Sequence, residues 1–398
     1  MLNNAFSPWP SFTQQEADAV QKVLLSNKVN YWTGQEGREF EKEFAAFTDC
    51  QYAIALANGT LALDLALVAL GIGGRNGGNE DDEVIVTSRT FLASASSIVT
   101  AGAKPIFADV DSNSQNITAE TIAAVLSENT KAIICVHLAG MPCEMDPIMA
   151  LADERQLMVI EDCAQAHGTK YRGRSVGSIG HIGAWSFCQD KIMTTGGEGG
   201  MVTTNDGALW KKMWAYKDHG KSYDAVYNKE HPPGFRWLHE SFGTNWRLTE
   251  MQSIIGRIQL KRMPQWFDKR NANAKAIENA LSRFDCIRLV KVPDYIEHAQ
   301  YKYYAFVKPE FLADGWTRDD IVNEIVALGV PCFQGCCSEV YLEKAFDGTD
   351  YRPAQALPTA KVLGETSLMF LVHPTLTDEN INSTCTAIID VLTKANRA

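Results

Sequence analysis

Three short stretches of this sequence carry polar side chains that could act together on one ligand. Glu161 and Asp162 follow an apolar run, Lys191 precedes a glycine-rich loop, and Asn58-Gly59-Thr60 separates two apolar segments. A carboxylate at the end of a buried strand is costly unless a cation or a strong donor meets it. A lysine in dry surroundings has a lowered pKa and becomes a nucleophile. A helix that begins at 58–60 would offer free backbone N–H groups to a phosphate.

Together these groups match what pyridoxal phosphate needs from a protein. A buried carboxylate pairs with the ring nitrogen and keeps the ring an electron sink, while a lysine forms an imine with the aldehyde. Each group alone has an ordinary explanation, because most lysines are exposed and Asp and Asn-Gly often cap helices or form turns. Their combination at predicted sheet edges favours the cofactor site and leaves those explanations open.

The elements around these residues are predicted to form an α/β fold with a mostly parallel sheet sandwiched by helices. Short apolar runs alternate with helical segments over 52–161, which is typical of parallel strands covered on both faces. Ligands bind at the carboxyl edge of such sheets, where Asp162 and the 58–60 turn fall. Strands expected at 182–188 and 201–204 have no long helix between them, which predicts an antiparallel member.

Two domains are expected. Residues 1–285 would form a large domain that binds the cofactor, and 286–398 a smaller α/β domain that restarts with a strand at 303–307 and ends in a helix at 377–395. A charged helix predicted over 248–283 would bridge them. No Pro/Ser-rich linker separates the two, so the boundary is soft.

Composition narrows the class of protein. The chain has 398 residues, of which 45% are hydrophobic and 21% charged, with a formal net charge of −11. Such a chain can bury a sizeable core, and its charge disfavours nucleic-acid or anionic-membrane partners. The start shows no signal-peptide pattern and no apolar run is long enough to span a bilayer, so we expect a cytoplasmic protein. Ten scattered cysteines fit reduced thiols better than a disulfide framework.

Two further segments could be mistaken for sites. The cluster Cys332, Cys336 and Cys337 has no neighbouring His or CxxC pair, so we expect a packed loop there and predict no metal centre. Residues 74–82 are predicted to form an exposed acidic loop. The glycines at its start follow a helix rather than a strand, so they are not a dinucleotide fingerprint. This disfavours a nucleotide-dependent oxidoreductase.

Several longer segments resemble one known family, in the family's order, from about residue 7 to the C-terminus. They are WTGQEGREFEKEFA, TFLASASSIVTAGAKPIFADVD, TKAIICVHLAG, EDCAQAHGTKYRGRSVGSIGHIGAWSF, KIMTTGGEGGMVTTND, GTNWRLTEMQSIIGRIQL and LVHPTLTDE. On these segments the chain resembles the DegT/DnrJ/EryC1/StrS nucleotide-sugar aminotransferases, which are fold-type I pyridoxal phosphate enzymes. A match of this length is far more specific than a short motif.

The resemblance implies a role for each matching position of the cofactor site. Lys191 would form the Schiff base and carry the proton between the amino donor and the cofactor. The other implied cofactor contacts are Gly59, Thr60 and Ser186 at the phosphate, Phe91 against the ring, Asp162 at the ring nitrogen, Gln165 beside the phenolic oxygen, and Asn245 at the phosphate of a partner subunit.

The role of Asn245 implies a homodimer with shared active sites. Without the resemblance, Phe91 would be taken as a core aromatic residue and Asn245 as a turn residue. Arg247 is a candidate for binding a donor carboxylate or a nucleotide phosphate, with a surface salt bridge as the alternative. The family's entrance for the sugar nucleotide matches Trp32 and Thr33. His373 is a further substrate-site candidate for which a structural role is favoured.

The activity implied is transamination from glutamate to a keto-sugar nucleotide carrying the keto group at C3 or C4, for lipopolysaccharide, other surface polysaccharide or secondary-metabolite sugars. Lys191 argues against the family's dehydratases, which carry His at that position. A pyridoxal phosphate-binding regulatory protein without turnover is the alternative. Residues 332–338 fall where the family places variable substrate-facing residues, and the sequence fixes neither the sugar nor its nucleotide.

Overall fold

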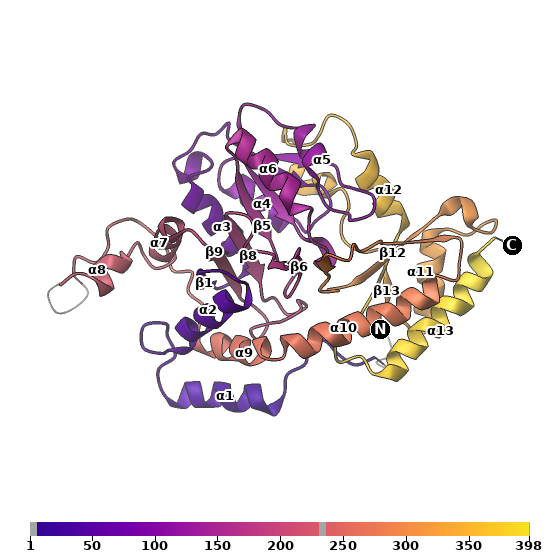
Figure 1. Ribbon diagram of the computed structural model, residues 1–398, viewed down its shortest axis with the longest axis horizontal. Helices are drawn as coiled ribbons and strands as arrows, with labels where there is room; N and C mark the ends of the chain where they lie inside the picture. The colour runs from indigo at the N-terminus through magenta and orange to yellow at the C-terminus, as the bar shows by residue number, and fades with distance from the viewer. Residues whose placement is uncertain (1–5, 231–235, 398) are drawn as a thin grey trace.

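The computed structural model describes residues 6–230 and 236–397 of the chain (Figure 1). Its larger part is built on a seven-stranded sheet of order β1-β9-β8-β5-β4-β2-β3. Neighbours from β8 to β3 are parallel, whereas β9 runs antiparallel to β8 and β1. The predicted α/β class and its antiparallel member are therefore confirmed. The strands are β1 (Tyr52–Leu56), β2 (Glu83–Thr87), β3 (Lys104–Ala108), β4 (Thr130–Val136), β5 (Met158–Asp162), β8 (Ile182–Ser186) and β9 (Gly200–Thr204).

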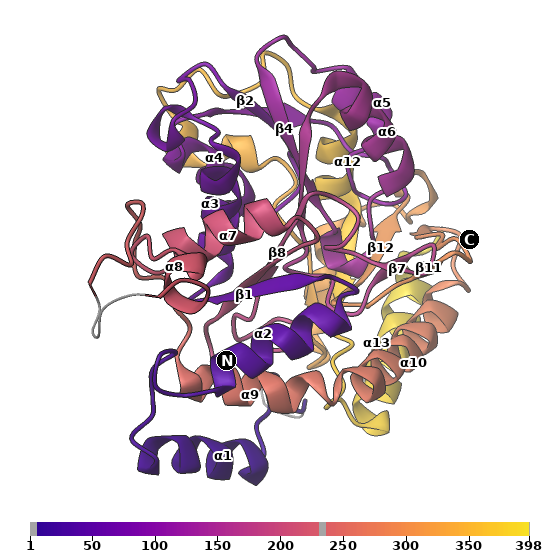
Figure 2. The same cartoon turned by 60° about the vertical axis from the view of Figure 1, so that its left-hand side comes forward.

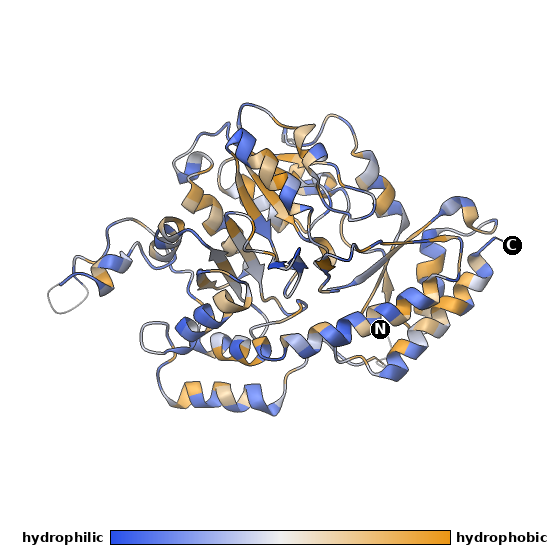
Figure 3. Cartoon of the chain, in the orientation of Figure 1, coloured by the Kyte–Doolittle hydropathy of each residue, from blue (hydrophilic) through white to orange (hydrophobic). Residues whose placement is uncertain are grey.

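Helices cover both faces of this sheet (Figures 1 and 2). The strands are short and mostly apolar, and several stretches of the sheet are orange in Figure 3, as expected for strands that lie between two helical layers. The larger part contains α1 (Gln14–Leu25), α2 (Glu36–Phe47), α3 (Gly59–Leu70), α4 (Ala93–Thr100), α5 (Ala119–Ala123), α6 (Met145–Arg155), α7 (Gly207–Tyr216), α8 (Tyr223–Tyr227) and α9 (Glu250–Leu260).

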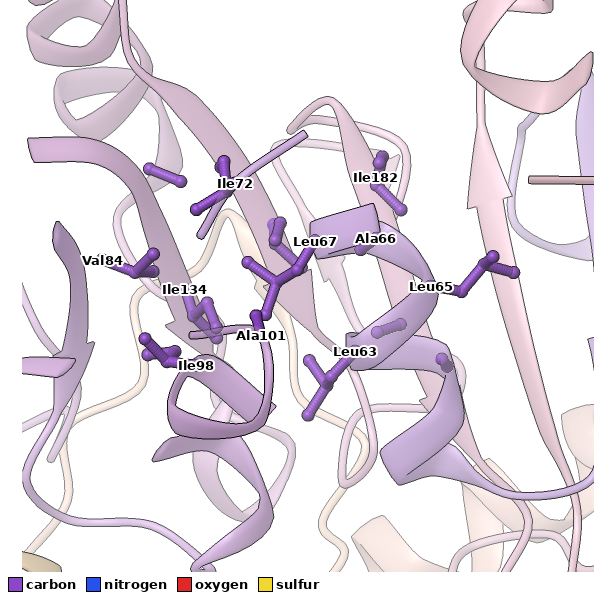
Figure 4. Close-up of a cluster of buried hydrophobic side chains, with 14 of the residues drawn as sticks. Leu63, Leu65, Ala66, Leu67, Ile72, Val84, Ile98, Ala101, Ile134 and Ile182 are labelled. Carbon is purple, nitrogen blue, oxygen red and sulfur yellow. The ribbon is translucent and has the colours of Figure 1, made fainter. Parts of the chain in front are cut away.

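Helix α3 packs deeply in the core and positions the site. Apart from Thr60 and Asp64 the helix is apolar, and a helix with so wide an apolar surface must be largely buried; the side chains of Leu63, Leu65 and Leu67 all lie in the core around α3 (Figure 4). Its first turn is fixed because the side chain of Asn58 accepts the N–H of Leu61 at 2.9 Å. The helix ends at Leu70, and the capping residue Gly71 has a φ of 69°, a left-handed conformation that favours glycine.

The second sheet is antiparallel, with the order β10-β12-β14-β13. Helices α10 and α13 lie side by side against it in both views (Figures 1 and 2). The elements are α10 (Met263–Leu281), β10 (Ile287–Leu289), β12 (Tyr303–Val307), α11 (Arg318–Ala327), β13 (Cys332–Phe333), α12 (Pro358–Thr366), β14 (Ser367–Phe370) and α13 (Asp378–Ala395). A small third sheet joins β11 (Ile296–Glu297), β6 (Lys170–Tyr171) and β7 (Arg174–Ser175).

The single helix expected over 248–283 is two helices, α9 and α10. Pro264 lies in the first turn of α10, where its missing N–H costs nothing, whereas in a helix interior it would clash with the preceding turn. The prediction of one helix was therefore wrong at the proline.

The two parts exchange segments. Tyr341 and Phe346 come from the C-terminal third but pack in the core around the large sheet, and Phe6 packs on the core around the second sheet. The division at 285/286 stays a prediction.

The 74–82 loop is only partly the exposed segment expected. Glu80 and Asp81 are exposed, but Asp82 is buried and accepts the N–H groups of Gly73 and Asn79, both at 3.0 Å. Its carboxylate thus holds the loop closed, as an Asx-type contact does.

All ten cysteines are free thiols. Within residues 6–230 and 236–397, no helix combines the length and the apolar character needed to cross a bilayer.

The contact between α2 and α9 yields a test of packing. A Cβ at Gly256 would lie 2.5 Å from Cζ of the fully buried Phe40, so we expect Gly256→Ala to lower the free energy of unfolding by about 1–3 kcal/mol. Chemical denaturation measures this. Lys261→Ala, at the exposed end of the same helix, should change it by less than about 0.5 kcal/mol, and equal values for the two variants would contradict the close packing.

Candidate active site

A cavity of about 830 Å³ opens at the carboxyl edge of the large sheet. Its walls come from the start of α3, the start of α4, the ends of β5 and β8, and the loop that carries Lys191. The second part of the chain closes it with Tyr301, Lys302, Tyr304, Phe333, Gly335, Cys336, Met369 and Leu371. A volume of this size is typical of a small-molecule site.

Asp162 presents its carboxylate to this cavity from the end of β5. The side chain is 6% exposed. Its Oδ2 accepts the hydroxyl of Ser94 at 2.8 Å, and its Oδ1 accepts the N–H of Ala164 at 3.1 Å. A buried carboxylate held by two neutral donors keeps lone pairs that can accept from a cationic partner in the cavity. A protonated ring nitrogen would be such a partner.

Glu161 points to the opposite face of β5, because successive strand side chains alternate. Three N–H groups of the 177–180 turn donate to it at 2.6–2.9 Å. His137 Nδ1 accepts the N–H of Cys143, so Nε2 carries the proton and donates to Glu161 at 2.9 Å. Burial alone would raise the pKa of Glu161, but the donors from His137 and the turn hold that pKa below its usual value.

Hydrogen bonds within the protein therefore account for the close approach of His137, Glu161 and Cys163. Their ligand-type atoms lie within 4.8 Å of one another, the spacing of a metal site. The oxygens of Glu161 are already occupied by four donors, so the cluster is a hydrogen-bonded brace between strands.

Lys191 lines the cavity from the loop between β8 and β9. Its N–H donates to the carbonyl of Cys188, and its own carbonyl accepts the indole N–H of Trp9 at 2.8 Å. Its Nζ lies 5.4 Å from the ring centroid of Tyr301, whose hydroxyl donates to Asp190. Burial would raise the pKa of Asp190, but the Lys191 charge and the Tyr301 hydroxyl lower it overall.

The start of α3 provides an anion cradle. The first N–H groups of a helix have no intrahelical partner, and the Asn58 side chain takes that of Leu61, which leaves those of Gly59 and Thr60 for a ligand. Ser186 lies directly opposite, so close that a Cβ at Gly59 would be 2.5 Å from the Ser186 Cβ. All three predicted phosphate residues therefore line the cavity together.

Gln165 and Phe91 also line this cavity. The Gln165 Oε1 accepts the N–H of Ala139 at 2.8 Å, so its amide NH₂ remains available to donate. Phe91 is 69% exposed, which a core aromatic residue would not be.

Five predicted residues do not line the cavity of the described chain: Trp32, Thr33, Asn245, Arg247 and His373. Arg247 Nη1 lies 2.5 Å from Oδ1 of the buried Asp218, and Asn245 bridges to the backbone of Asp218.

The remaining three are spread over two places. Thr33 is exposed, and Trp32 packs edge-on against Trp214 with ring centroids 6.0 Å apart. His373 is buried and stacks on Trp9 with centroids 5.9 Å apart. Burial lowers the pKa of His373 to about 3, which fits a structural imidazole behind Lys191.

Several residues of the site were missed in the sequence. Ser94 was hidden in a predicted helix, and Trp9 in an irregular start. Tyr301 and Lys302 lie just before a strand of the smaller part. None has a motif of its own, because each reaches the site only through long-range packing.

A lysine and a buried carboxylate lie at the carboxyl edge of an α/β sheet, beside a free helix N-terminus, an arrangement that an aminotransferase can use. The chain belongs to the DegT/DnrJ/EryC1/StrS aminotransferase family, whose model matches residues 10–389.

Known proteins agree with this assignment. The GDP-perosamine synthase of Caulobacter vibrioides is 36% identical over 390 residues, 96% of this chain and 97% of that protein. A dTDP-3-amino-3,4,6-trideoxy-alpha-D-glucose transaminase of Streptomyces venezuelae is 32% identical over 360 residues, 90% of this chain and 87% of that one. The X-ray structure of an aminotransferase from Psychrobacter cryohalolentis is 64% identical, with a TM-score of 0.94 over 98% of this chain and 99% of that one.

The brace at Glu161 makes stability depend on acidity. Its pKa is lowered in the fold, so its contribution is present above the unfolded pKa of about 4.3 and is lost as pH falls through the folded value. We expect Glu161→Gln to lose about 3 kcal/mol of unfolding free energy at pH 7 and to show a shallower decline below pH ~5. Denaturant titrations across pH measure both.

The exposed Glu154 provides the control, since Glu154→Gln should follow the unmodified protein at every pH. If the unfolding free energy of Glu161→Gln fell with acidity as steeply as that of the unmodified protein, this carboxylate would not be the source of the pH dependence.

Proposed function

We propose that this chain is a pyridoxal phosphate-dependent aminotransferase that moves an amino group from glutamate to a keto-sugar nucleotide. The observation that carries the proposal is that Lys191, Asp162 and the free N-terminus of α3 line one cavity. A carboxylate whose acceptor positions were all filled by protein donors could not also bind a ring nitrogen. Asp162 still has acceptor capacity and faces the open cavity.

The residues present fit this cofactor. The N–H groups of Gly59 and Thr60 and the Ser186 hydroxyl would hold its phosphate, Asp162 its protonated ring nitrogen, and the Gln165 amide its phenolic oxygen. Phe91 would cover one face of the ring. When bound, the group supplies the electron sink that stabilises negative charge at the substrate carbon.

The chain itself supplies the acid–base chemistry. The Lys191 amine lies at the cavity wall, where it would take the proton from Cα of the donor and deliver it within the same site. Return of the proton to the carbon of the sugar that accepts the amino group would use the same amine. Such a positioned base contributes on the order of 10²–10⁴ in rate.

A keto-sugar nucleotide is proposed as the acceptor because the relatives are named for GDP- and dTDP-linked amino sugars. They differ in nucleotide, so the nucleotide and the C3 or C4 position of the keto group are open. A role in surface-polysaccharide or secondary-metabolite sugar synthesis follows from this acceptor. The free thiols support a reducing compartment, so we propose the cytoplasm.

We also propose a homodimer in which Asn245 completes the phosphate site of the partner. Asn245 lies outside the cavity of its own chain. The segment that leads to it carries Trp237 and Phe242, which are 83% and 99% exposed. Two large apolar side chains exposed this far on the segment before Asn245 support our proposal that a partner covers it.

Lys191 gives the direct test. The purified protein should be yellow, and Lys191→Ala should lose both that absorbance and all amino transfer when keto-sugar nucleotides with GDP, UDP or dTDP are supplied with L-glutamate. Lys212→Ala, on the exposed face of α7, should behave as the unmodified protein. Amino transfer that survives in Lys191→Ala would overturn the assignment.

Shared sites predict rescue between two inactive variants. In a mixed dimer of Lys191→Ala with Asn245→Ala, one of the two sites contains both native residues if Asn245 acts across the interface. Doubly tagged mixed dimers should therefore recover about half of the wild-type activity per dimer. If Asn245 serves its own chain, every site carries one defect and no activity returns.

A further inference from the structure

Lys302 is a half-buried lysine in the cavity wall that the cofactor site does not use. It lies immediately before β12, and its Nζ is 4.9 Å from the ring centroid of Tyr301. The Lys191 Nζ lies 5.4 Å from the same centroid. One phenol ring thus has both amines beside it, and no described residue forms an ion pair with Lys302.

The charges around Lys302 leave it short of a counter-ion. Burial lowers the pKa of Lys302 to about 8; Asp190 acts in the opposite direction, whereas Arg270 and Lys191 lower it further. The Asp190 carboxylate already accepts the Tyr301 hydroxyl. Lys302, still protonated at neutral pH, therefore lies near two cations, Arg270 and Lys191, and near one anion that already has a hydrogen-bond donor. An incoming anion would be stabilised here.

The position of Lys302 favours a carboxylate of the amino donor. The Lys191 amine marks where the donor Cα must come, and the carboxylates of a donor such as glutamate extend only a few bonds from that carbon. The diphosphate of the other substrate would be separated from the reacting carbon by the sugar ring. Arg247, the other candidate, is already paired with Asp218 at 2.5 Å.

On the basis of the proposed function, we infer that Lys302 is the carboxylate-binding residue for the amino donor. Its ammonium group pairs with a carboxylate of L-glutamate and, in the reverse direction, of 2-oxoglutarate. This makes Lys302 a specificity-determining residue contributed by the smaller part of the chain.

The test separates donor from acceptor. In the cofactor-loaded enzyme, Lys302→Gln should raise KM for L-glutamate roughly 10- to 100-fold, the usual worth of a charge-assisted hydrogen bond. It should weaken glutarate binding, measured by calorimetry, by the same factor, and leave KM for the keto-sugar nucleotide within about 3-fold. Lys302→Arg should retain most of the donor affinity.

Lys308 offers a matched control at the other end of β12, where its Nζ lies over the Phe311 ring at 4.7 Å and away from the cavity. Lys308→Gln should change none of these constants. A rise in KM for the sugar nucleotide with unchanged glutarate affinity would assign Lys302 to the diphosphate and overturn the inference, as would no change in either constant. The two proposals can also fail separately. If the unmodified protein binds glutarate and Lys302→Gln does not, but the unmodified protein transfers no amino group, the carboxylate site is supported and the proposed reaction is contradicted.

Discussion

Two adjacent carboxylates at the end of β5 set the constraint around which the site is organised. Both are removed from water, so each must find donors or destabilise the sheet edge. Strand alternation sends them to opposite faces. Glu161 takes three backbone N–H groups and an imidazole, which joins β4, β5 and the turn before β8. Asp162 is then left at a rigid edge with a lone pair directed to the cavity.

The rest of the site depends on this rigid edge because its groups come from distant segments. The start of α3 is held because the helix packs its mostly apolar surface into the core, and Lys191 follows β8, the strand paired with β5. The smaller part adds Tyr301 and Lys302. Under the proposed function, a cofactor held at the edge of the large sheet would therefore face a substrate space that the smaller part helps to line.

Much of this arrangement could be predicted from the sequence. Apolar runs with β-strand length located the strands, and parallel strands place their carboxyl ends at one edge, so Asp162 and the 58–60 turn were expected together. Lys191 required its loop to fold back on that edge, and the resemblance supplied this step. The break between α9 and α10 near Pro264 and the burial of Asp82 were not predicted. Apolar periodicity indicates which side of a segment is buried, but it does not show the hydrogen bonds of individual backbone groups.

The place of other residues in the site could not be predicted, for a physical reason: they reach it only through the packing of distant segments. Ser94 meets Asp162 only after α4 packs against α3, β2 and β3, and Lys302 comes near Lys191 only after the two sheets come together. Asn245, Arg247 and Trp32 lie outside the cavity of the described chain, so the roles assigned to them from the sequence stay predictions. Long-range contacts of this kind leave no spacing in the sequence.

The hydrogen bond from Trp9 to the Lys191 carbonyl has a consequence for how the lysine moves. Glycine-rich loops are ordinarily the mobile part of a scaffold, and Trp9 is itself wedged between Trp266 and His373. The backbone that carries the amine is thereby anchored, so its reach is restricted to rotations of its own methylene chain. In the proposed proton transfer, little orientational entropy would then be left for this amine to lose, which is the advantage of a group preorganised before its reactants arrive.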